Sequence, residues 1–319
     1  MMLMLTLLVA GFVLLTKGGD FLVGGSSSIA KHFNIPELVI GLTIVSFGTS
    51  APELLVNIMA TFSGSTEIAL GNVIGSNICN TLLILGAAGL IAPIAVQRGT
   101  VWKEIPFALF VSILLGFLLN DFFYSTPRHY SLSRSDGIIL LALLTLFLLY
   151  VYKLSKEGNN TDNSTIKEST VSKSLLFIVM GLAGLVAGGR LVVSSAVDIA
   201  LALGVSQALI GLTVVAVGTS LPELFASVMA AYRGKPDIAI GNVVGSNIFN
   251  ILLVLGISST INEIPYPGYL NIDLLVVILS CFFVFVFMFF GKRHRIERVE
   301  ALLLVTAYLV YTIYLVIRR

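Results

Sequence analysis

The chain has 319 residues, of which 57% are hydrophobic and 11% are charged, and its mean hydropathy is +1.00. Soluble domains carry about 25% charged residues, so this composition excludes a water-soluble globular protein and predicts a protein embedded in lipid. The formal net charge of +2 does not indicate a nucleic-acid partner, because the positive residues fall between the apolar runs. Cys79 and Cys281 both lie within apolar runs and lack the spacing of a disulfide framework or a metal site.

Ten apolar segments follow one another along the chain, each long enough to cross the roughly 30 Å hydrocarbon core of a bilayer as a helix. Only helices are expected, because an isolated segment in lipid has to satisfy its own backbone hydrogen bonds. The first segment lacks the positive start and the cleavage site of a signal peptide, so we interpret it as the first span. The predicted spans are 2–30, 37–62, 68–92, 100–119, 136–153, 173–201, 207–231, 238–261, 269–290 and 299–317.

Residues 39–86 and 209–256 are two copies of one segment, 170 residues apart. They align without a gap, and 28 of their 48 positions are identical. The match extends upstream to the Gly-Gly pairs at 18–19 and 188–189. Each copy belongs to a group of five spans. Since five is odd, the second group enters the membrane from the opposite side, and the direct repeat in sequence becomes an inverted repeat in space.

The predicted domains are an N-terminal half, 1–153, and a C-terminal half, 173–319, joined by a polar linker at 154–172. The linker has the composition of a flexible segment and is too short for a folded regulatory domain. With ten spans, thirteen Lys and Arg lie on the side that carries the linker and four on the other side. The positive-inside rule then places the linker in the cytoplasm and both termini outside, in a multi-pass protein of the plasma (inner) membrane.

Each copy contains a Gly-Thr-Ser-x-Pro-Glu motif near the middle of a predicted span, at 48–53 and 218–223. Proline has no N–H, and its ring clashes with the carbonyl four residues earlier, while glycine weakens the helix at the same point. The motif therefore predicts a broken helix with freed carbonyl oxygens. Irregular backbone at membrane depth is tolerated only where it is buried in protein or lines a cavity.

The same motif places carboxylates at membrane depth, where they are costly unless compensated. Ser50 and Ser220 precede Glu53 and Glu223 by three positions and share a helical face with them. The partner helices carry polar residues at four-residue spacing, which are Asn72, Ser76, Asn80, Asn242, Ser246 and Asn250. These residues offer oxygen ligands and include no His or Cys. Such a set suits Ca²⁺ or Na⁺ rather than Zn²⁺ or Cu²⁺.

Plainer interpretations exist for some of these residues. A single buried Glu can be a structural partner, but two in symmetric, proline-broken motifs favour an ion site. Glu67 and Asp237 stand at helix starts and are better explained as interfacial residues that interact with the helix dipole. Asp20 and Arg190 occupy equivalent positions in the two halves, where they form either an ion pair between the halves or two separate interfacial residues.

The sequences GTSAPE with GNVIGSNICN, and GTSLPE with GNVVGSNIFN, resemble the two repeats of the sodium/calcium exchanger branch of the calcium/cation antiporter superfamily. The resemblance covers essentially the whole chain and is closest to the compact prokaryotic members. It implies an all-α integral membrane protein with ten transmembrane helices, arranged as two inverted five-helix repeats with broken core helices. The long first and sixth helices are then expected to slide across that core and alternate access to it.

The resemblance also implies the roles of individual residues. Glu53 and Glu223 would bridge a calcium site together with the carbonyl oxygens of Thr49 and Thr219. Flanking sodium sites would use Ser50, Ser220, Ser76, Ser246 and the carbonyl oxygens of Ser46 and Ala216, with Asn80 reaching the centre. Asn250 is a departure, because some prokaryotic relatives and the potassium-dependent branch carry Asp there. A centre with two carboxylates and two amides argues against potassium dependence.

We therefore expect a secondary active antiporter that exchanges Na⁺ for Ca²⁺ by alternating access and extrudes calcium, with no cofactor and no partner beyond the bilayer and its ions. One alternative is a Ca²⁺/H⁺ or other cation antiporter on the same scaffold, whose flux would depend on pH without sodium. A second is a cation channel, whose flux would need no counter-ion. An enzyme is disfavoured, since the sequence has no nucleophile–His pair and no HExxH motif.

Overall fold

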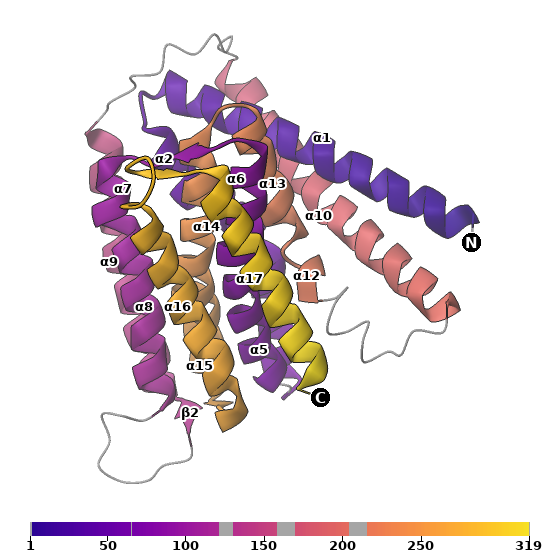
Figure 1. Ribbon diagram of the computed structural model, residues 1–319, viewed down its shortest axis with the longest axis vertical. Coiled ribbons are helices and arrows are strands. Elements are labelled where there is room, and N and C mark those ends of the chain that lie inside the picture. Colours follow the sequence, from indigo (N-terminus) through magenta and orange to yellow (C-terminus); the bar gives the residue numbers. More distant parts are fainter. Residues whose placement is uncertain (1, 65, 121–129, 158–169, 204–215, 319) are drawn as a thin grey trace.

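The computed structural model describes residues 2–64, 66–120, 130–157, 170–203 and 216–318. Among these residues, eight helical runs are long and apolar enough to span a membrane, and a helix pair bent by 44° makes a ninth. Figure 1 shows them as an upright bundle from which two long helices lean away side by side. The predicted spans agree with the observed helices to within a few residues wherever both ends are described.

The N-terminal half begins with one long helix, continues with a broken span, and ends with three further spans. Its elements are α1 (Met2–His32), α2 (Glu37–Ile40), η1 (Gly41–Val45), α3 (Ser46–Thr49), α4 (Ala51–Phe62), α5 (Thr66–Ile78), η2 (Cys79–Ile84), α6 (Leu85–Ile91), β1 (Ile94–Ala95), α7 (Arg98–Trp102), α8 (Glu104–Leu119), β2 (Ser131–Leu132) and α9 (Arg134–Lys156).

The C-terminal half repeats this order. Its elements are α10 (Val171–Ala202), α12 (Ala216–Gly218), α13 (Leu221–Tyr232), α14 (Pro236–Phe249), η4 (Asn250–Leu255), α15 (Gly256–Ile261), β3 (Ile264–Pro265), η5 (Gly268–Leu270), α16 (Asn271–Phe287), β4 (Arg295–Ile296) and α17 (Arg298–Ile317). The span predicted at 207–231 begins outside the described residues, and α12 with α13 is its described part. The runs α5–η2–α6 and α14–η4–α15 are the most buried of the spans and form the centre of the bundle.

The chain alternates between two faces of the molecule. One face, which we name the terminal face, contains the start of α1 and the ends of α4 and α17. The other face, which we name the linker face, contains the ends of α9 and α13 and the start of α10. The linker face is uppermost in Figure 1. Because every span reverses direction, corresponding ends of the two halves lie on opposite faces. This is the inverted repeat that the odd number of spans predicts.

The two halves interlock at both faces. α9 of the first half packs against η4 and α15 of the second, and α17 of the second half packs against η2 and α6 of the first. Two short antiparallel ladders reinforce these contacts, β1 with β4 and β2 with β3. These strands were not predicted, because only helices were expected from the sequence. They are two residues long, and their pairing depends on which span ends the fold brings together.

α1 and α10 form a separate antiparallel pair in which the backbones touch. A Cβ atom on Gly18 would lie 2.8 Å from the Leu185 nitrogen, and one on Gly181 would lie 2.5 Å from the Leu22 nitrogen. Such distances leave no room for a side chain, as in other tightly packed membrane helix pairs with small residues at the interface. The pair meets the bundle mainly through α13.

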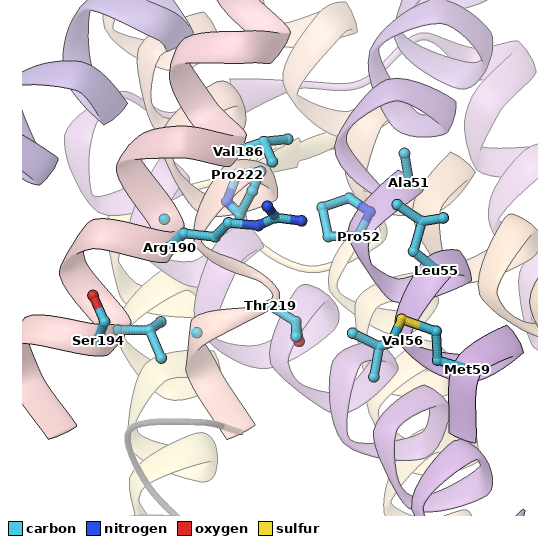
Figure 2. A pocket seen from close by; sticks show the side chains of 13 residues that line it. Ala51, Pro52, Leu55, Val56, Met59, Val186, Arg190, Ser194, Thr219 and Pro222 are labelled. Atoms are coloured by element: carbon cyan, nitrogen blue, oxygen red, sulfur yellow. The ribbon is translucent and has the colours of Figure 1, made fainter. Parts of the chain in front are cut away.

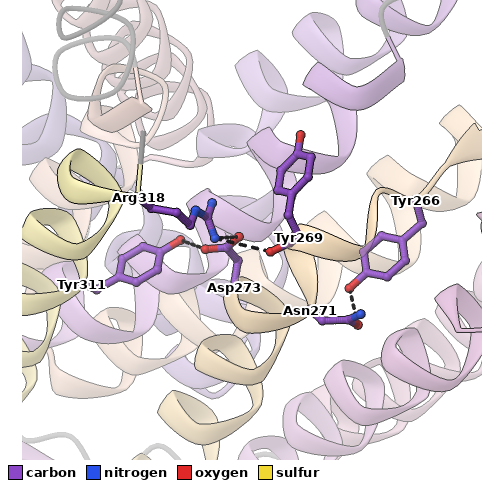
Figure 3. Close-up of polar contacts among 6 residues, drawn as sticks. All are labelled: Tyr266, Tyr269, Asn271, Asp273, Tyr311 and Arg318. Atoms are coloured by element: carbon purple, nitrogen blue, oxygen red, sulfur yellow. Dashed lines mark hydrogen bonds and ion pairs between the residues drawn. The ribbon is translucent and has the colours of Figure 1, made fainter.

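A buried carboxylate ties the end of α17 to the start of α16 (Figure 3). Asp273 Oδ2 lies 2.8 Å from Arg318 Nη1, and the Tyr311 hydroxyl donates to Asp273 Oδ1 at 2.8 Å. Nearby, the Tyr266 hydroxyl donates to Asn271 Oδ1 at 2.8 Å. Burial, together with the charge of Asp273, raises the pKa of Tyr266 to about 12, so this hydroxyl remains a donor at neutral pH.

We expect Tyr311→Phe to lower the free energy of unfolding by about 1.5–3 kcal/mol, the range for a hydrogen bond to a charged group. The ring is retained, so packing is preserved while one contact to Asp273 is lost. Thermal unfolding in detergent measures the effect. Tyr269→Phe serves as the control, because the Tyr269 ring lies against the Arg318 guanidinium at 5.7 Å from its centroid, whereas the hydroxyl that donates to Asp273 belongs to Tyr311. Equal Tm values for the two variants would contradict a role for this bond.

Candidate ion-binding site

The two Gly-Thr-Ser-x-Pro-Glu motifs break their helices as predicted. α3 ends at Thr49, Ser50 has φ −82° and ψ 4°, and α4 begins at the next residue. In the second half, Ser220 has φ −88° and ψ 6° and precedes α13. Each new helix carries its proline at one of its first two positions. Because proline has no N–H, the carbonyl oxygens of Gly48 and Gly218 have no helical donor four residues later.

Both glutamates lie in the first turn of the new helix and are fully buried. Glu53 is 0% exposed and Glu223 is 1% exposed. Each one faces the Thr-Ser pair of the opposite half: Ser50 Oγ donates to Glu223 Oε1 at 3.0 Å, while Thr219 and Ser220 lie beside Glu53. Each carboxylate thus lies beside the helix break of the other half. The breaks therefore bring one carboxylate from each half to a common centre.

Most of the oxygens at this centre have no hydrogen bond within the described part of the chain. They are both carboxylate oxygens of Glu53, Oε2 of Glu223, and the hydroxyl oxygens of Ser76, Ser220 and Ser246. Both amide atoms of Asn80 and Oδ1 of Asn250 are also unpaired. All of these residues are buried. Buried polar atoms are almost always paired in stable proteins, so this set of free oxygens has the chemistry of a site for a cation.

The hydroxyl and amide groups around the centre connect the two halves. Thr49 Oγ1 donates to Asn242 Oδ1 at 3.1 Å, and its counterpart Thr219 Oγ1 approaches Asn72 Oδ1 at 3.5 Å. Asn242 also donates to the Glu223 carbonyl at 3.3 Å and to Ser227 Oγ at 2.8 Å. These contacts position the polar stripe of α5 and α14 directly beside the broken helices.

Two further amides, Asn77 and Asn247, were not predicted as part of the site. Asn250 Nδ2 donates to Asn77 Oδ1 at 3.1 Å, and Asn247 Nδ2 donates to Thr81 Oγ1 at 2.7 Å. Both amides lie between the two halves rather than on the stripe with four-residue spacing. The sequence did contain a signal for these two amides, because both copies of the repeat keep Gly-Ser-Asn at these positions.

The core helices also contain π-helical turns that were not predicted. η2 begins at Cys79 and η4 begins at Asn250, one residue apart in the repeat numbering. A π-turn inserts extra residues per turn and often marks a functional site. Asn80 and Asn250 stand at the start of these turns, where the helix departs from regular α-helical geometry. Four-residue spacing alone therefore does not define where these two amides point.

The two carbonyl positions expected from the resemblance differ in what the structure shows of them. Ser46 is buried at the start of α3, and its carbonyl oxygen accepts from the Ser50 N–H at 3.0 Å and from Thr49 Oγ1 at 3.3 Å. A cation at this oxygen would therefore share it with two donors or displace one of them. Ala216 begins α12 at the edge of the described residues.

A cavity of about 530 Å³ reaches the breaks from the side of α4 and α10. Its wall is largely apolar, and it ends at Thr219 and at the two prolines of the motifs. Figure 2 shows the Arg190 guanidinium extending from α10 toward Pro52 and Pro222. Arg190 does not pair with Asp20, since Asp20 forms its ion pair with Arg233. An ion pair between the halves does exist, but the equivalent positions 20 and 190 do not form it.

An inverted pair of five-helix repeats with two broken helices and a buried oxygen-rich centre defines a secondary transporter, not an enzyme. The family model for the sodium/calcium exchanger protein matches residues 3–153 and 173–317. The chain belongs to this family and is a multi-pass membrane protein.

The chain is similar to relatives along most of its length. It is 38% identical to the putative antiporter CaxA of Alkalimonas amylolytica over 94% of this chain and 95% of that one. It is 31% identical to the sodium/calcium exchanger MaX1 of Methanosarcina acetivorans over 97% of both chains. Among solved structures, the sodium-calcium exchanger NCX_Mj superposes with a TM-score of 0.82 at 34% identity over 97% of both chains. The predicted fold, with ten helices in inverted repeats, is thereby confirmed.

Proposed function

We propose that this protein exchanges Na⁺ for Ca²⁺ across a membrane and binds both ions at the cluster around Glu53 and Glu223. The observation that carries the proposal is the geometry of the two carboxylates. Each comes from a helix break of one half, each faces the hydroxyl groups of the other, and three of the four carboxylate oxygens lack a hydrogen bond among the described residues. A shared cation is what this arrangement can hold.

The charge of the cluster explains why the two ions would compete. Two carboxylates balance one Ca²⁺, which takes six to eight oxygen ligands in flexible geometry. The same oxygens can instead be divided among several Na⁺ ions. Occupancy by one kind of ion then excludes the other, and mutual exclusion at a site with alternating access produces antiport. An exchange of three Na⁺ for one Ca²⁺ would move net charge.

We assign equivalent residues of the two halves to the same ion. Glu53, Glu223 and the carbonyl oxygens of Thr49 and Thr219 would hold Ca²⁺. The positions that would hold Na⁺ are Ser50, Ser76, Ser220 and Ser246, with the carbonyl oxygens of Ser46 and Ala216. The amides of Asn80 and Asn250 would complete the centre without adding charge. The unpaired oxygens of Ser76, Ser220, Ser246 and Asn80 support this assignment.

The distribution of positive residues supports an orientation with the linker face in the cytoplasm and both termini outside, in the plasma (inner) membrane. An inward Na⁺ gradient would then drive Ca²⁺ out of the cell. The cavity beside α4 and α10 would face the exterior, since the residues of α4 that line it precede the end of this helix at the terminal face.

Uptake of ⁴⁵Ca²⁺ into proteoliposomes loaded with Na⁺ and diluted into Na⁺-free buffer tests the proposal. We expect uptake that requires internal Na⁺ and is lost when Na⁺ is equal on both sides. Uptake driven equally well by a pH gradient without Na⁺ would replace sodium coupling by proton coupling. Flux without any counter-ion would indicate a channel. No uptake by correctly folded protein under either gradient would rule out calcium as the cargo.

We expect Asn250→Asp to make Na⁺/Ca²⁺ exchange depend on pH or on an added monovalent cation such as K⁺. A third carboxylate beside two buried ones is stable only when it binds a proton or another cation. The measurement is the exchange rate of the variant and of the native chain across pH, with and without K⁺. Asn250→Gln, which keeps an amide, is the control. A flat pH profile and no effect of K⁺ in Asn250→Asp would show that this position lies outside the charged centre.

A further inference from the structure

Residues 233–237, which form the turn after α13 and the first two residues of α14, carry three charged residues, Arg233, Lys235 and Asp237, and each contacts the opposite half of the chain. We propose that this turn is a charged clasp that keeps the ion site closed at the linker face, and that opening the site toward that face requires its release. The proposal rests on the proposed transport function, because it concerns how access to the same site alternates.

The three contacts join the turn to three different elements. Arg233 Nη2 lies 2.5 Å from Asp20 Oδ1 on α1, and its Nε donates to the same oxygen at 2.7 Å. Lys235 Nζ lies 2.9 Å from Glu37 Oε1 at the start of α2, with the two side chains only 4% and 12% exposed. One five-residue turn thus binds the first helix and the start of the broken span.

The third contact extends the clasp to the segment before α7. Gln97 Nε2 donates to Asp237 Oδ2 at 2.6 Å. A Cβ atom on Gly24 would lie 3.1 Å from Arg233 Nη1, so the guanidinium lies directly on the surface of α1. A charge pair that is one-third exposed contributes little to stability, but a buried pair such as Lys235 with Glu37 resists separation because removing one member from a buried ion pair is costly.

The sequence of the repeat does not conserve the Arg233–Asp20 pair on the other face. At the 170-residue offset, Arg233 corresponds to Ser63 and Asp20 corresponds to Arg190. A serine and an arginine cannot form the equivalent ion pair. The turn reads RGKPD in the second half and SGSTE in the first, and this is one of the least similar stretches of the duplicated segment. The two faces thus share a backbone plan but differ in charge.

Helix packing is also tighter at the linker face, where the clasp lies, than at the terminal face. α1 lies against α13, where a Cβ atom on Gly19 would be 2.9 Å from the Phe225 carbonyl oxygen. The equivalent positions on the other face are Gly189 and Leu55, and these two residues line the cavity of about 530 Å³ instead of touching. Figure 2 shows Leu55 at this cavity. The structure is therefore closed where the clasp lies and open at the opposite face.

A hydrogen bond at the site follows the same pattern. Asn242 ties the Glu223 carbonyl and Ser227 to α14, whereas the amide nitrogen of its counterpart Asn72 is unpaired among the described residues. The inverted repeat implies a second state in which α1 has moved off α13 and α10 has closed on α4. In that state Arg233 and Asp20 are pulled apart. The clasp therefore favours the state that is open at the terminal face.

Two equivalent methionines provide matched reporters for these states. Met59 lines the cavity at the open face, and Met229 lies 3.4 Å from the Cβ position of Gly19 at the closed face. The experiment places Met59→Cys or Met229→Cys in a background with Cys79→Ala and Cys281→Ala. It measures the rate of labelling by a water-soluble maleimide in detergent, without transport, in the absence of Ca²⁺.

With the clasp intact, we expect rapid labelling at position 59 and protection at position 229. Asp20→Asn should raise labelling at 229 at least threefold and lower it at 59. The exchanged pair Asp20→Arg with Arg233→Asp should restore both rates, which a general loss of structure would not do. Unchanged rates in Asp20→Asn, or no recovery in the exchanged pair, would overturn the proposal.

A second pair of substitutions creates the clasp contact on the opposite face. Ser63→Arg combined with Arg190→Asp places the two charges at the positions equivalent to Arg233 and Asp20. We expect lower labelling at position 59 and higher labelling at position 229 than in the parent. The opposite change, or none, would contradict the proposal. Because labelling does not depend on ion flux, a failure of Na⁺/Ca²⁺ exchange in proteoliposomes would be recognised separately.

Discussion

Glu53→Gln and Glu223→Gln are each expected to reduce Na⁺-dependent ⁴⁵Ca²⁺ uptake at least 100-fold. The substitution keeps the shape of the side chain and removes one of two negative charges from a fully buried centre. At an effective dielectric constant of about 20, one unit charge about 4 Å from another contributes about 4 kcal/mol, and a divalent ion doubles this figure. Even if dehydration of the ion offsets half of the resulting ~8 kcal/mol, the remaining ~4 kcal/mol exceeds the ~2.7 kcal/mol that corresponds to 100-fold.

The matched control for these variants is Glu104→Gln. Glu104 is also a buried carboxyl, but it lies at the start of α8 and accepts a hydrogen bond from the Tyr150 hydroxyl. Its replacement should leave calcium uptake within a few-fold of the native rate. Binding of Ca²⁺ by isothermal calorimetry separates loss of the site from loss of movement. Native-like binding and uptake in either Glu53→Gln or Glu223→Gln would remove that carboxylate from the proposed site.

Gly181→Ala is expected to have the second large effect, although it adds a single methyl group. The new Cβ would lie 2.5 Å from the Leu22 nitrogen and 2.8 Å from the Gly18 carbonyl oxygen, both backbone atoms that cannot move as a side chain can. α1 and α10 would have to separate. Overpacking of this kind costs about 1–3 kcal/mol or more, and it acts on the helix pair that is expected to slide during transport. We expect a lower Tm and at least tenfold slower exchange.

Gly116→Ala distinguishes this effect from helix propensity. At that position in α8 the new Cβ would meet only the side-chain ends of Leu274 and Ile278, at 3.5 and 3.7 Å. Alanine favours a helix over glycine by about 1 kcal/mol, so Gly116→Ala should be neutral or stabilising. If both variants showed the same Tm as the native chain, close packing of the α1–α10 pair would not be required for stability.

Much of the site could be predicted because both copies of the repeat keep polar and charged residues that are energetically costly at membrane depth. Proline after glycine in an apolar span breaks a helix by covalent geometry alone, and a carboxylate in the same turn has few explanations other than an ion. The positions of Glu53 and Glu223 in the first turn of α4 and α13 follow from these local rules. That Glu223 would be paired with Ser50 of the opposite half did not follow.

The parts that could not be predicted depend on contacts between segments far apart in the chain. The cross-half amides Asn77 and Asn247 find their partners only when α5 and α14 cross. The π-turns at Cys79 and Asn250 leave no local signature, since their residues are ordinary helix formers in an apolar run. The partner of Asp20 was open for a similar reason: sequence equivalence suggested Arg190, while the fold brings Arg233 to the same side of α1.

The sequence by itself determined the membrane class, the ten spans, the inverted repeat and the oxygen chemistry at the helix breaks. These follow from composition, periodicity and backbone chemistry, each of which acts within one span. The tertiary structure alone decided which face is closed, because closure depends on α1 lying against α13 while α10 stands apart from α4. The two halves share one sequence pattern, so the pattern cannot distinguish the faces, whereas the contacts between helices far apart in the chain do.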